Sequence, residues 1–446
     1  MAQSNLSAAK EAKNDEFYTQ LSDIQAEMSN YPDKFKGKVV LCNCDDPFES
    51  NFVKYFLMNF NRLGLKELIA TGYKTSFIGG SEIGTANTPY VLRVSSTTKY
   101  LVGTQKDLDI RGAKFFLETE GNRVMTPLIG NTALDEEGKQ IKVPVKVPVI
   151  DEDGNPVLDK NGKVKTKTVQ QDLYYEAGDF RSDMSLALLD EANVVVTNPP
   201  FSLFREFMSL LIRHNKEFLV IGNLNAVQNK DFFPYILDGK VWMGATCFNG
   251  GATYFVGPKE LYDPEKMSNP KNAYIKNNLL YWRVNGVRWY TNIDHARRHQ
   301  MLPLDLGFMY EGHEDMYPTF ENYNAINVDK VSQIPCDYKG EIGVPVSFMD
   351  KYCPEQFKII GIGIGELGQK LGITPIPKEI DETLPGHSSV WRNYYIKDGK
   401  PVVPYGRIII KFTDEYIDTH PEQFKKGEMY VDAMNKNPEK LMQNKK

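Results

Sequence analysis

Residues 193–204 read NVVVTNPPFSLF, and this stretch decides the fold. Three consecutive valines predict a strand buried on both faces, because β-branched residues suit a covered pleated surface. Two prolines then end the strand, since neither can donate a backbone hydrogen bond and each fixes its own φ. We therefore expect residues 198–201 to form a stiff turn at the carboxyl end of a strand, the edge at which ligands bind in open α/β sheets.

The segments around this stretch alternate strands with helices. Residues 38–42 predict a strand, residues 48–64 an amphipathic helix and residues 66–73 a second strand. This strand, helix, strand order is the unit of a doubly wound sheet, so the expected fold class is α/β. Further elements of the pattern are expected at 185–192, 193–196, 203–215, 217–224, 240–248, 252–257 and 287–294.

Residues 134–170 interrupt this order and predict a protruding β-hairpin. Valines alternate with polar residues there, and Asp-Gly and Asn-Gly pairs supply turn signals. Asp151, Asp153 and Asn155 resemble part of a calcium loop. However, Gly154 falls one place before the glycine of an EF-hand loop, which favours a plain turn.

Composition sets broad limits. A length of 446 residues allows two or three domains, and 41% hydrophobic with 25% charged residues is typical of a globular protein. The N-terminus is polar and no signal peptide or membrane span is recognisable, so we expect a cytoplasmic protein without a membrane partner. Five scattered cysteines indicate reduced thiols. The formal charge of -5 argues mildly against nucleic acid as a partner, although a local basic surface would still serve.

An Asn-Pro-Pro-Phe turn suits one chemical task, the alignment of an exocyclic amine with an electrophilic methyl group. The lone pair of a conjugated amine is delocalised, so hydrogen-bond acceptors must redirect it. The Asn198 side-chain carbonyl and the Pro199 backbone carbonyl can accept hydrogen bonds from the amine, and Pro200 adds no competing donor. Phe201 would stack on the nucleobase that carries the amine. Such positioning contributes on the order of 7–11 kcal/mol at best. The alternative is a purely structural, strand-ending turn.

The sequence resembles the EcoRI-type adenine-specific DNA methyltransferases over most of its length. The resemblance implies a Rossmann-like, S-adenosylmethionine-dependent methyltransferase sheet with a mixed C-terminal target-recognition region. It also implies methyl transfer to the N6 amine of a flipped-out adenine at a specific site in double-stranded DNA. The motifs that carry it are DEFYTQ (15–20), KVVLCNCDDP (38–47), GDFRS (178–182), VVVTNPPFSLF (194–204), WYTNID (289–294), YNAINV (323–328), and GVPVSF with PEQF (343–357).

The same resemblance implies roles for individual residues. The segment Phe17, Tyr18 and Thr19 would lie near the methionine end of S-adenosylmethionine, and Asp179 with Phe180 would bind its adenine. The first cofactor loop would be Asn43, Cys44, Asp45 and Asp46, and the catalytic motif Asn198, Pro199, Pro200 and Phe201.

Two departures accompany the resemblance. The loop CNCDDP lacks the Gly-x-Gly of most methyltransferases, a lack that the EcoRI-type enzymes share. The second strand ends in ATGY without an acidic partner for the ribose hydroxyls, so Thr71 or Tyr73 could replace that partner.

A second glycine-rich string competes for the cofactor. Residues 357–372 read FKIIGIGIGELGQKLG and hold Gly363, Gly365 and Gly368 in Gly-x-Gly-x-x-Gly register. Prolines break the following segment before another strand could form, so no βαβ unit is predicted and we interpret the string as a flexible loop.

The string DHARRH contains His295 and His299 at the spacing of a metal pair. Arg297 and Arg298 would repel a cation and no glutamate accompanies them, so we expect no metal. The basic and aromatic segment 266–299 instead predicts contacts with a DNA backbone, although a solvated basic face is the alternative. The candidates are Arg283, Arg288, Arg297 and Arg298.

Tyr254 and Phe255 are weaker candidates. The family resemblance implies that an aromatic from this part of the sheet sandwiches the flipped base opposite Phe201, but core packing explains a strand aromatic more often.

We therefore predict a catalytic domain at 1–300, with an insertion at about 120–170, and a DNA target-recognition region at 301–446. The predicted partner is double-stranded DNA, and the resemblance leans towards a monomer. The existence of a cognate restriction endonuclease that acts on the same site is left open by the sequence. The alternatives are a methyltransferase acting on RNA or on a protein glutamine, and a catalytically silent DNA-binding relative.

Overall fold

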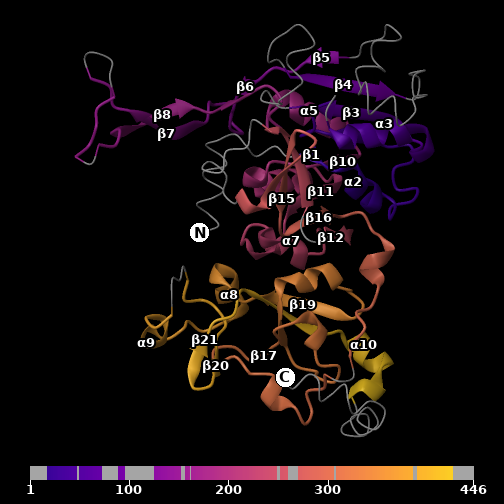
Figure 1. The fold of residues 1–446 in the computed structure, drawn as a ribbon, viewed down its shortest axis with the longest axis vertical. Helices are drawn as coiled ribbons and strands as arrows, with labels where there is room; N and C mark the ends of the chain where they lie inside the picture. The colour runs from indigo at the N-terminus through magenta and orange to yellow at the C-terminus, as the bar shows by residue number, and fades with distance from the viewer. Residues whose placement is uncertain are drawn as a thin grey trace. The chain divides into compact units, whose positions relative to one another are not determined.

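The computed structural model describes residues 18–47, 50–72, 89–95, 125–151, 156–160, 162–248, 252–259, 270–305, 308–384 and 389–424. These residues form two compact units. Figure 1 labels their helices and strands. Unit 1 takes in Ser22–Lys34 and the described residues from Phe201 onward, and unit 2 takes in the described residues up to Leu21 and from Phe35 to Pro200. The predicted division at residue 300 concerns function and stays a prediction.

Unit 2 contains the predicted strand, helix, strand order. Strand β2 (Val39–Cys42) leads through α3 (Asn51–Leu63) to β3 (Glu67–Thr71), and the two strands pair in parallel. The helix forms because apolar side chains recur on its buried face, the Ser50 hydroxyl caps its first turn, and Gly64 ends it at a left-handed φ of 63°. The βαβ prediction is therefore confirmed.

The valine stretch is the strand β10 (Val194–Thr197), and all four of its residues are buried. It pairs in parallel with β2 on the side opposite β3, and α5 (Asp183–Glu191) leads into it. Beyond β3, the strands β4 (Tyr90–Ser95) and β5 (Met125–Pro127) continue in antiparallel fashion. Unit 2 thus holds a mixed sheet with a parallel core, in the order β10-β2-β3-β4-β5.

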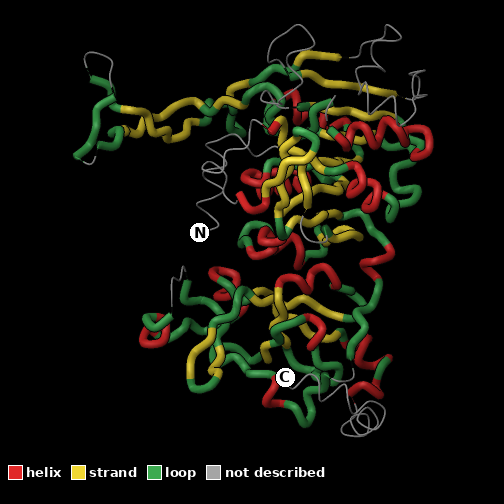
Figure 2. The backbone as a smooth tube through the Cα atoms, in the orientation of Figure 1, coloured by secondary structure: helices red, strands yellow, loops and turns green. Residues whose placement is uncertain are grey.

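The predicted hairpin is also confirmed. Strands β7 (Lys142–Pro148) and β8 (Thr166–Asp172) pair antiparallel, with Val145 opposite Val169. Figure 2 shows the ladder as a long arm. Alternate residues of β7 are exposed, and so is every residue of β8 except Val169. At its base β6 (Asn131–Thr132) pairs with β9 (Tyr174–Tyr175). The calcium-loop alternative lies partly outside the described residues.

In unit 1, the helix after the Asn-Pro-Pro turn packs on a strand. The helix α6 (Phe204–Arg213) begins with Phe204, which is buried and lies over Gly222 of β11 (Glu217–Asn223). A Cβ at Gly222 would meet the Phe204 ring at 2.3 Å, so only glycine admits the ring. Phe204 also contacts the rings of Phe232 and Tyr290, at centroid distances of 5.5 Å and 5.1 Å. The first turn of α6 is therefore anchored.

Three strands of unit 1 form an antiparallel group around β16 (Val287–Thr291), which pairs with β11 and with β12 (Trp242–Cys247). A second group pairs β13 (Ala252–Pro258) with β15 (Leu279–Val284), and β15 with β14 (Ala273–Lys276). The β14–β15 hairpin was not predicted. Its turn consists of Asn277 and Asn278, both at positive φ, and Asn-Asn is a weaker turn signal than Asn-Gly.

The region after residue 300 is mixed and lacks long helices among its described residues, as predicted. Its sheet has the order β17-β18-β22-β19.

No helix in the described ranges has both the length and the hydrophobicity that a membrane span requires. The remaining elements are β1 (Tyr18–Thr19), α2 (Leu21–Met28), α7 (Phe233–Leu237), β17 (Ile326–Asn327), β18 (Ile342–Pro345), β19 (Phe357–Ile362), α8 (Gly365–Leu371), α9 (Lys378–Asp381), β20 (Tyr395–Lys397), β21 (Lys400–Val402), β22 (Arg407–Phe412) and α10 (Asp414–Thr419).

The glycine-rich string at 357–372 is not a flexible loop, so that expectation is wrong. It forms β19 followed directly by the short helix α8. Close packing explains two of its glycines. A Cβ at Gly363 would lie 1.5 Å from the Asn393 Oδ1 atom, and one at Gly368 would lie 2.8 Å from the Trp391 carbonyl oxygen.

A buried carboxylate joins α2 to β12 within unit 1. Glu27 has no exposed surface, and it accepts hydrogen bonds from the Tyr31 hydroxyl at 2.6 Å and from the N–H groups of Ala245 and Thr246 at 2.8 Å and 2.7 Å. The Thr246 hydroxyl donates to it as well, at 2.5 Å. The Tyr31 hydroxyl and the Ala245 N–H are buried, and the two Thr246 donors are partly buried, so all of them would lose this acceptor out of reach of bulk water if the carboxylate were removed.

We predict that Glu27→Ala lowers the free energy of unfolding by about 3 kcal/mol, because several buried donors lose their acceptor at once. Urea denaturation monitored by circular dichroism measures the change. The control is Glu137→Ala, since Glu137 pairs with Lys139 with both side chains 73% exposed, and such pairs contribute little. Equal midpoints for both variants would contradict the prediction.

Candidate functional site

The loop Asn43–Asp46 follows β2 and is tied to both neighbouring strands. The Asp45 N–H donates to the Thr71 carbonyl at 3.0 Å, and the Thr71 hydroxyl donates to the Asn43 carbonyl at 3.2 Å. On the other side, the Cys44 N–H donates to the Thr197 hydroxyl oxygen at 3.2 Å. Thr71 and Thr197 are the last residues of β3 and β10. The loop therefore lies at the carboxyl edge of the parallel strands, where ligands bind in α/β sheets.

Asp45 joins this loop to the Asn-Pro-Pro turn. Its Oδ1 atom accepts from the Ser50 hydroxyl at 2.7 Å, its Oδ2 atom accepts from the Thr197 hydroxyl, and the Asn198 N–H also donates to the carboxylate. Burial raises the pKa of Asp45 to about 7, although these donors lower it. The structure thus brings a predicted cofactor residue and the predicted catalytic residue Asn198 together.

Thr19 lies at the N-terminus of α3, near the same loop. Its carbonyl oxygen accepts from the Asn51 side chain at 2.6 Å, and Asn51 follows the Ser50 cap that binds Asp45. Phe17 and the side chain of Tyr18 lie outside the described residues. Of the three residues predicted to lie near the methionine end, Thr19 is therefore placed beside the Asn43–Asp46 loop.

Two buried polar atoms of these segments, the Thr19 hydroxyl oxygen and the Asn43 side-chain nitrogen, have no hydrogen-bond partner among the residues that the structure describes. Thr19 and Asn43 are each 2% exposed. Buried polar atoms are usually hydrogen-bonded, so these two are suited to a polar ligand. A hydroxyl can both donate and accept and an amide nitrogen donates, which fits the ammonium and carboxylate of an amino acid.

Asp179 and Phe180 follow β9, which pairs with β6 and not with the parallel strands. The argument from successive strand ends thus holds for the Asn43–Asp46 loop but not for this pair. Asp179 accepts from the Arg181 side chain at 2.9 Å and 2.7 Å, and the guanidinium lies over the rings of Tyr175 and Phe180. The pairing of Arg181 with Asp179 was not predicted from the sequence. A contact between residues two positions apart does not appear in the helix or strand periodicity on which such a prediction relies.

The Asn-Pro-Pro-Phe turn follows the last buried residue of β10 without a break. Pro199 is buried, while Asn198 and Pro200 are partly exposed. Phe201 is also partly exposed and opens a short 3-10 turn, Phe201–Leu203, that runs into α6. The predicted stiff turn between a buried strand and a helix is confirmed.

The four predicted DNA-backbone arginines differ in their surroundings. Arg283 and Arg297 are exposed. Arg288 forms a two-pronged ion pair with Asp350, at 2.6 Å and 2.8 Å. Arg298 lies over the Trp242 ring, 3.8 Å from its centroid. Of the four, Arg283 and Arg297 are therefore the two that face solvent, and the contact with a DNA backbone stays a prediction.

The two predicted base-stacking aromatics lie on β13. In the pairing of β13 with β15, Tyr254 stands opposite Trp282 and Phe255 stands opposite Tyr281. Their side chains lie outside the described residues, so the stacking role stays a prediction.

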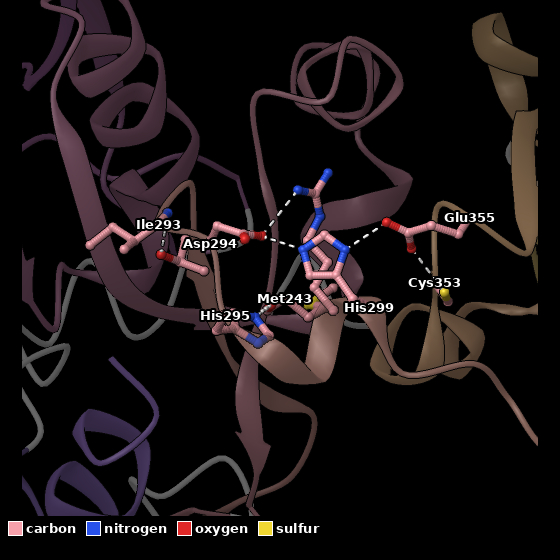
Figure 3. Close-up of polar contacts among 9 residues, drawn as sticks. Met243, Ile293, Asp294, His295, His299, Cys353 and Glu355 are labelled. Atoms are coloured by element: carbon pink, nitrogen blue, oxygen red, sulfur yellow. Dashed lines mark hydrogen bonds and ion pairs between the residues drawn. The ribbon is translucent and has the colours of Figure 1, made fainter. Parts of the chain in front are cut away.

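Figure 3 shows that the two histidines of DHARRH have separate partners. His295 is buried and its Nε2 atom lies 3.0 Å from the Met243 carbonyl oxygen. His299 is exposed and bridges two carboxylates, with Nδ1 2.6 Å from Glu355 and Nε2 2.8 Å from Asp294. No cluster that could hold a metal ion occurs among the residues that the structure describes.

Comparison with known proteins identifies one family and several relatives. The family model described as adenine-specific methyltransferase EcoRI matches residues 5–413. The type II methyltransferase M.EcoRI of Escherichia coli is 36% identical over 359 residues, which cover 80% of this chain and 88% of the relative. M.MpnI of Mycoplasma pneumoniae is 33% identical over 352 residues, covering 79% and 83%, and M.MgeORF184P of Mycoplasma genitalium is 31% identical over 353 residues, covering 79% and 84%. No solved structure matches the chain.

The His299 bridge predicts a pH dependence. Glu355 and then Asp294 raise the pKa of His299 above its ordinary value. The bridge therefore stabilises the fold fully below the pKa of a free histidine, about 6.5, and the contribution is lost as the pH rises through the higher folded-state pKa. NMR titration of the His299 ring should show a lower pKa in Glu355→Gln than in the wild-type protein. An unchanged titration curve would refute the bridge.

Proposed function

This chain belongs to the EcoRI family of adenine-specific DNA methyltransferases, and on that premise we propose the chemistry of its active site. It methylates adenine in DNA. The proposal is that a methyl group passes directly and in line from S-adenosylmethionine to the N6 amine of an adenine flipped out of a specific duplex site. The Rossmann-like methyltransferase fold is part of the same proposal, and the parallel core β10-β2-β3 supports it.

One observation carries this proposal. Asn198 follows a buried strand, and its N–H donates to the carboxylate of Asp45, a residue of the Asn43–Asp46 loop. The preceding residue, Thr197, donates to the same carboxylate. A cofactor loop and a catalytic turn must hold their positions relative to each other, because in-line transfer depends on the alignment of the reacting atoms. A shared buried carboxylate provides such a connection.

The residues of unit 2 fit the cofactor. S-adenosylmethionine supplies an electrophilic methyl group on a sulfonium. The Thr19 hydroxyl and the Asn43 amide would bind its amino-acid end, and Asp179 with Phe180 would hold its adenine. Thr71 is a poor candidate for the ribose, because it is fully buried and its hydroxyl already donates to Asn43. Tyr73 lies outside the described residues.

The catalytic turn acts by orientation. The Asn198 side-chain carbonyl and the Pro199 backbone carbonyl would accept hydrogen bonds from the adenine amine, which turns its lone pair toward the methyl group. Phe201 would stack on the face of the base. The amine nitrogen would bond to the methyl carbon as the carbon–sulfur bond of the sulfonium breaks, and the methylated, positively charged nitrogen would then release a proton to water. The turn therefore needs no general base.

DNA would be held mainly by unit 1. We assign the target-recognition role to the region 301–446 and phosphate contacts to the exposed Arg283 and Arg297. The β7–β8 hairpin would add contacts with the DNA, since a two-stranded ribbon fits the major groove. A monomer is expected, and a restriction endonuclease for the same site would act on the DNA without binding this chain.

The other functions are less well supported. Transfer to RNA or to a protein glutamine would use a similar turn, but the family is specific for adenine in DNA. A catalytically silent relative would have no need of the intact Asn-Pro-Pro-Phe turn. Digestion of methylated DNA to nucleosides and detection of N6-methyldeoxyadenosine separates all three.

We predict that Asn198→Ala abolishes methyl transfer and leaves S-adenosylmethionine binding nearly unchanged, because the side chain acts on the amine and not on the cofactor. Calorimetry measures binding, and radiolabelled methyl incorporation into duplex DNA measures transfer. Asn229→Ala, in a loop remote in sequence from the turn, is the control for a loss of an asparagine side chain. Unchanged turnover in Asn198→Ala would remove the assigned role.

Arg283→Ala should weaken DNA binding to all sequences alike and lower the slope of log K against log salt by about 1, as the loss of one phosphate contact requires. Fluorescence anisotropy at several salt concentrations gives the slope. Arg93 is the matched control, because it is already ion-paired with Glu67 and Glu191. A slope that stays the same in Arg283→Ala but falls in Arg93→Ala would reverse the assignment.

A further inference from the structure

We propose that Asp45 is a positioning residue for methyl transfer, whose buried carboxylate fixes the backbone of Asn198 and thereby locks the catalytic turn to the cofactor loop. This inference rests on the proposed function. It gives Asp45 a task different from the cofactor contact that the family resemblance implies, because the acceptor atoms of its side chain face protein groups.

The carboxylate is shielded and its acceptors are in use. Asp45 is 6% exposed, and its oxygens accept from the hydroxyls of Ser50 and Thr197 and from the N–H of Asn198. A carboxylate offers about four lone-pair sites, so three donors leave little for a ligand. The bond to the Asn198 N–H acts on the backbone of the residue whose side chain would orient the amine.

Thr197 makes this contact directional. Its hydroxyl oxygen accepts from the Cys44 N–H at 3.2 Å, so its single proton is directed to Asp45. Cys44 and Asp45 are consecutive residues of the loop, and Thr197 and Asn198 are consecutive residues at the end of β10. Two adjacent hydrogen bonds therefore join the two segments, which restrains rotation as well as separation.

Ser50 connects the same carboxylate to a helix. The Ser50 hydroxyl donates to Asp45 at 2.7 Å and accepts from the Phe52 N–H at 3.0 Å, which makes it the N-cap of the 13-residue helix α3. The positive end of the helix dipole favours a negative charge at this place. Loop, helix and catalytic turn thus meet at one carboxylate.

The contact has a consequence for pH. An ionised Asp45 accepts from all three donors, whereas a protonated one must give up an acceptor site to its own proton. Burial raises the pKa of Asp45 to about 7, and the neighbouring charge of Asp46 raises it as well. In the part of the chain that the structure describes, the other titratable groups beside it are the thiols of Cys42 and Cys44. We therefore expect kcat to rise with pH as Asp45 ionises.

The experiment compares Thr197→Val with Thr197→Ser in the full chain. Valine keeps the shape but removes the hydroxyl, and serine keeps the hydroxyl. We expect Thr197→Val to lose roughly 10- to 100-fold in kcat, the size of effect that misplacement of a reacting group by about 1 Å produces. The Kd for S-adenosylmethionine should stay within about threefold, and Thr197→Ser should recover most of the rate.

The pH profile of kcat, measured with saturating DNA and cofactor, separates positioning from a general structural role. Removal of a donor that favours the ionised form should move the rising limb of Thr197→Val to higher pH. Ser50→Ala removes another donor outside the strand and should move the limb in the same direction, which keeps the test valid if Thr197→Val fails to fold.

Two outcomes would overturn the inference while leaving the proposed function intact. One is a wild-type rate and pH profile in both Thr197→Val and Ser50→Ala. The other is a large rise in the Kd for S-adenosylmethionine with kcat unchanged. That result would indicate that Asp45 acts in cofactor binding. By contrast, a wild-type protein that fails to form N6-methyladenine in DNA would defeat the proposed function itself.

Discussion

The burial of the Asp45 carboxylate at the end of the parallel strands is the constraint on which the site depends. Removing a charge from water is costly unless hydrogen bonds replace the lost hydration, so the donors around it must be held in place. Those donors come from the cap of α3 and the end of β10, and the carboxylate itself belongs to the loop after β2. None of these segments can shift without leaving a buried polar group unsatisfied. The sheet edge is therefore rigid where the proposed reaction requires rigidity.

The sequence predicted most of this framework, because its strongest signals are local. The run of valines in β10, the apolar spacing of α3 and the alternation in β7 each specify an element within a few residues. The roles of Thr197 and Ser50 could not be predicted in this way. Each is an ordinary small polar residue in the sequence. The partner of Thr197 stands 152 residues away and is brought near by the fold, and Ser50 gains its role because Asp45, five residues before it, is buried beside it.

Charged residues show the same limit more plainly. The four arginines chosen from the basic segment look alike in the sequence, yet Arg288 is paired with Asp350, 62 residues further along, whereas Arg283 is exposed. A count of charges cannot separate an arginine that neutralises a partly buried acid from one that faces solvent. The glycine string at 357–372 was misjudged for a related reason. Its glycines make room for Asn393 and Trp391, which stand more than 20 residues away in sequence.

Among the described residues, the strands β7 and β8 pair only with each other, so the hairpin is a ribbon with two unpaired edges, and such edges invite intermolecular pairing into aggregates. Its sequence counters that risk. Pro144 and Pro148 supply no N–H for an incoming strand, and Lys142, Lys146 and Lys167 set like charges against a second copy of the arm. The composition of this ribbon can therefore be understood as protection against self-association, which lets a long exposed arm persist at high protein concentration.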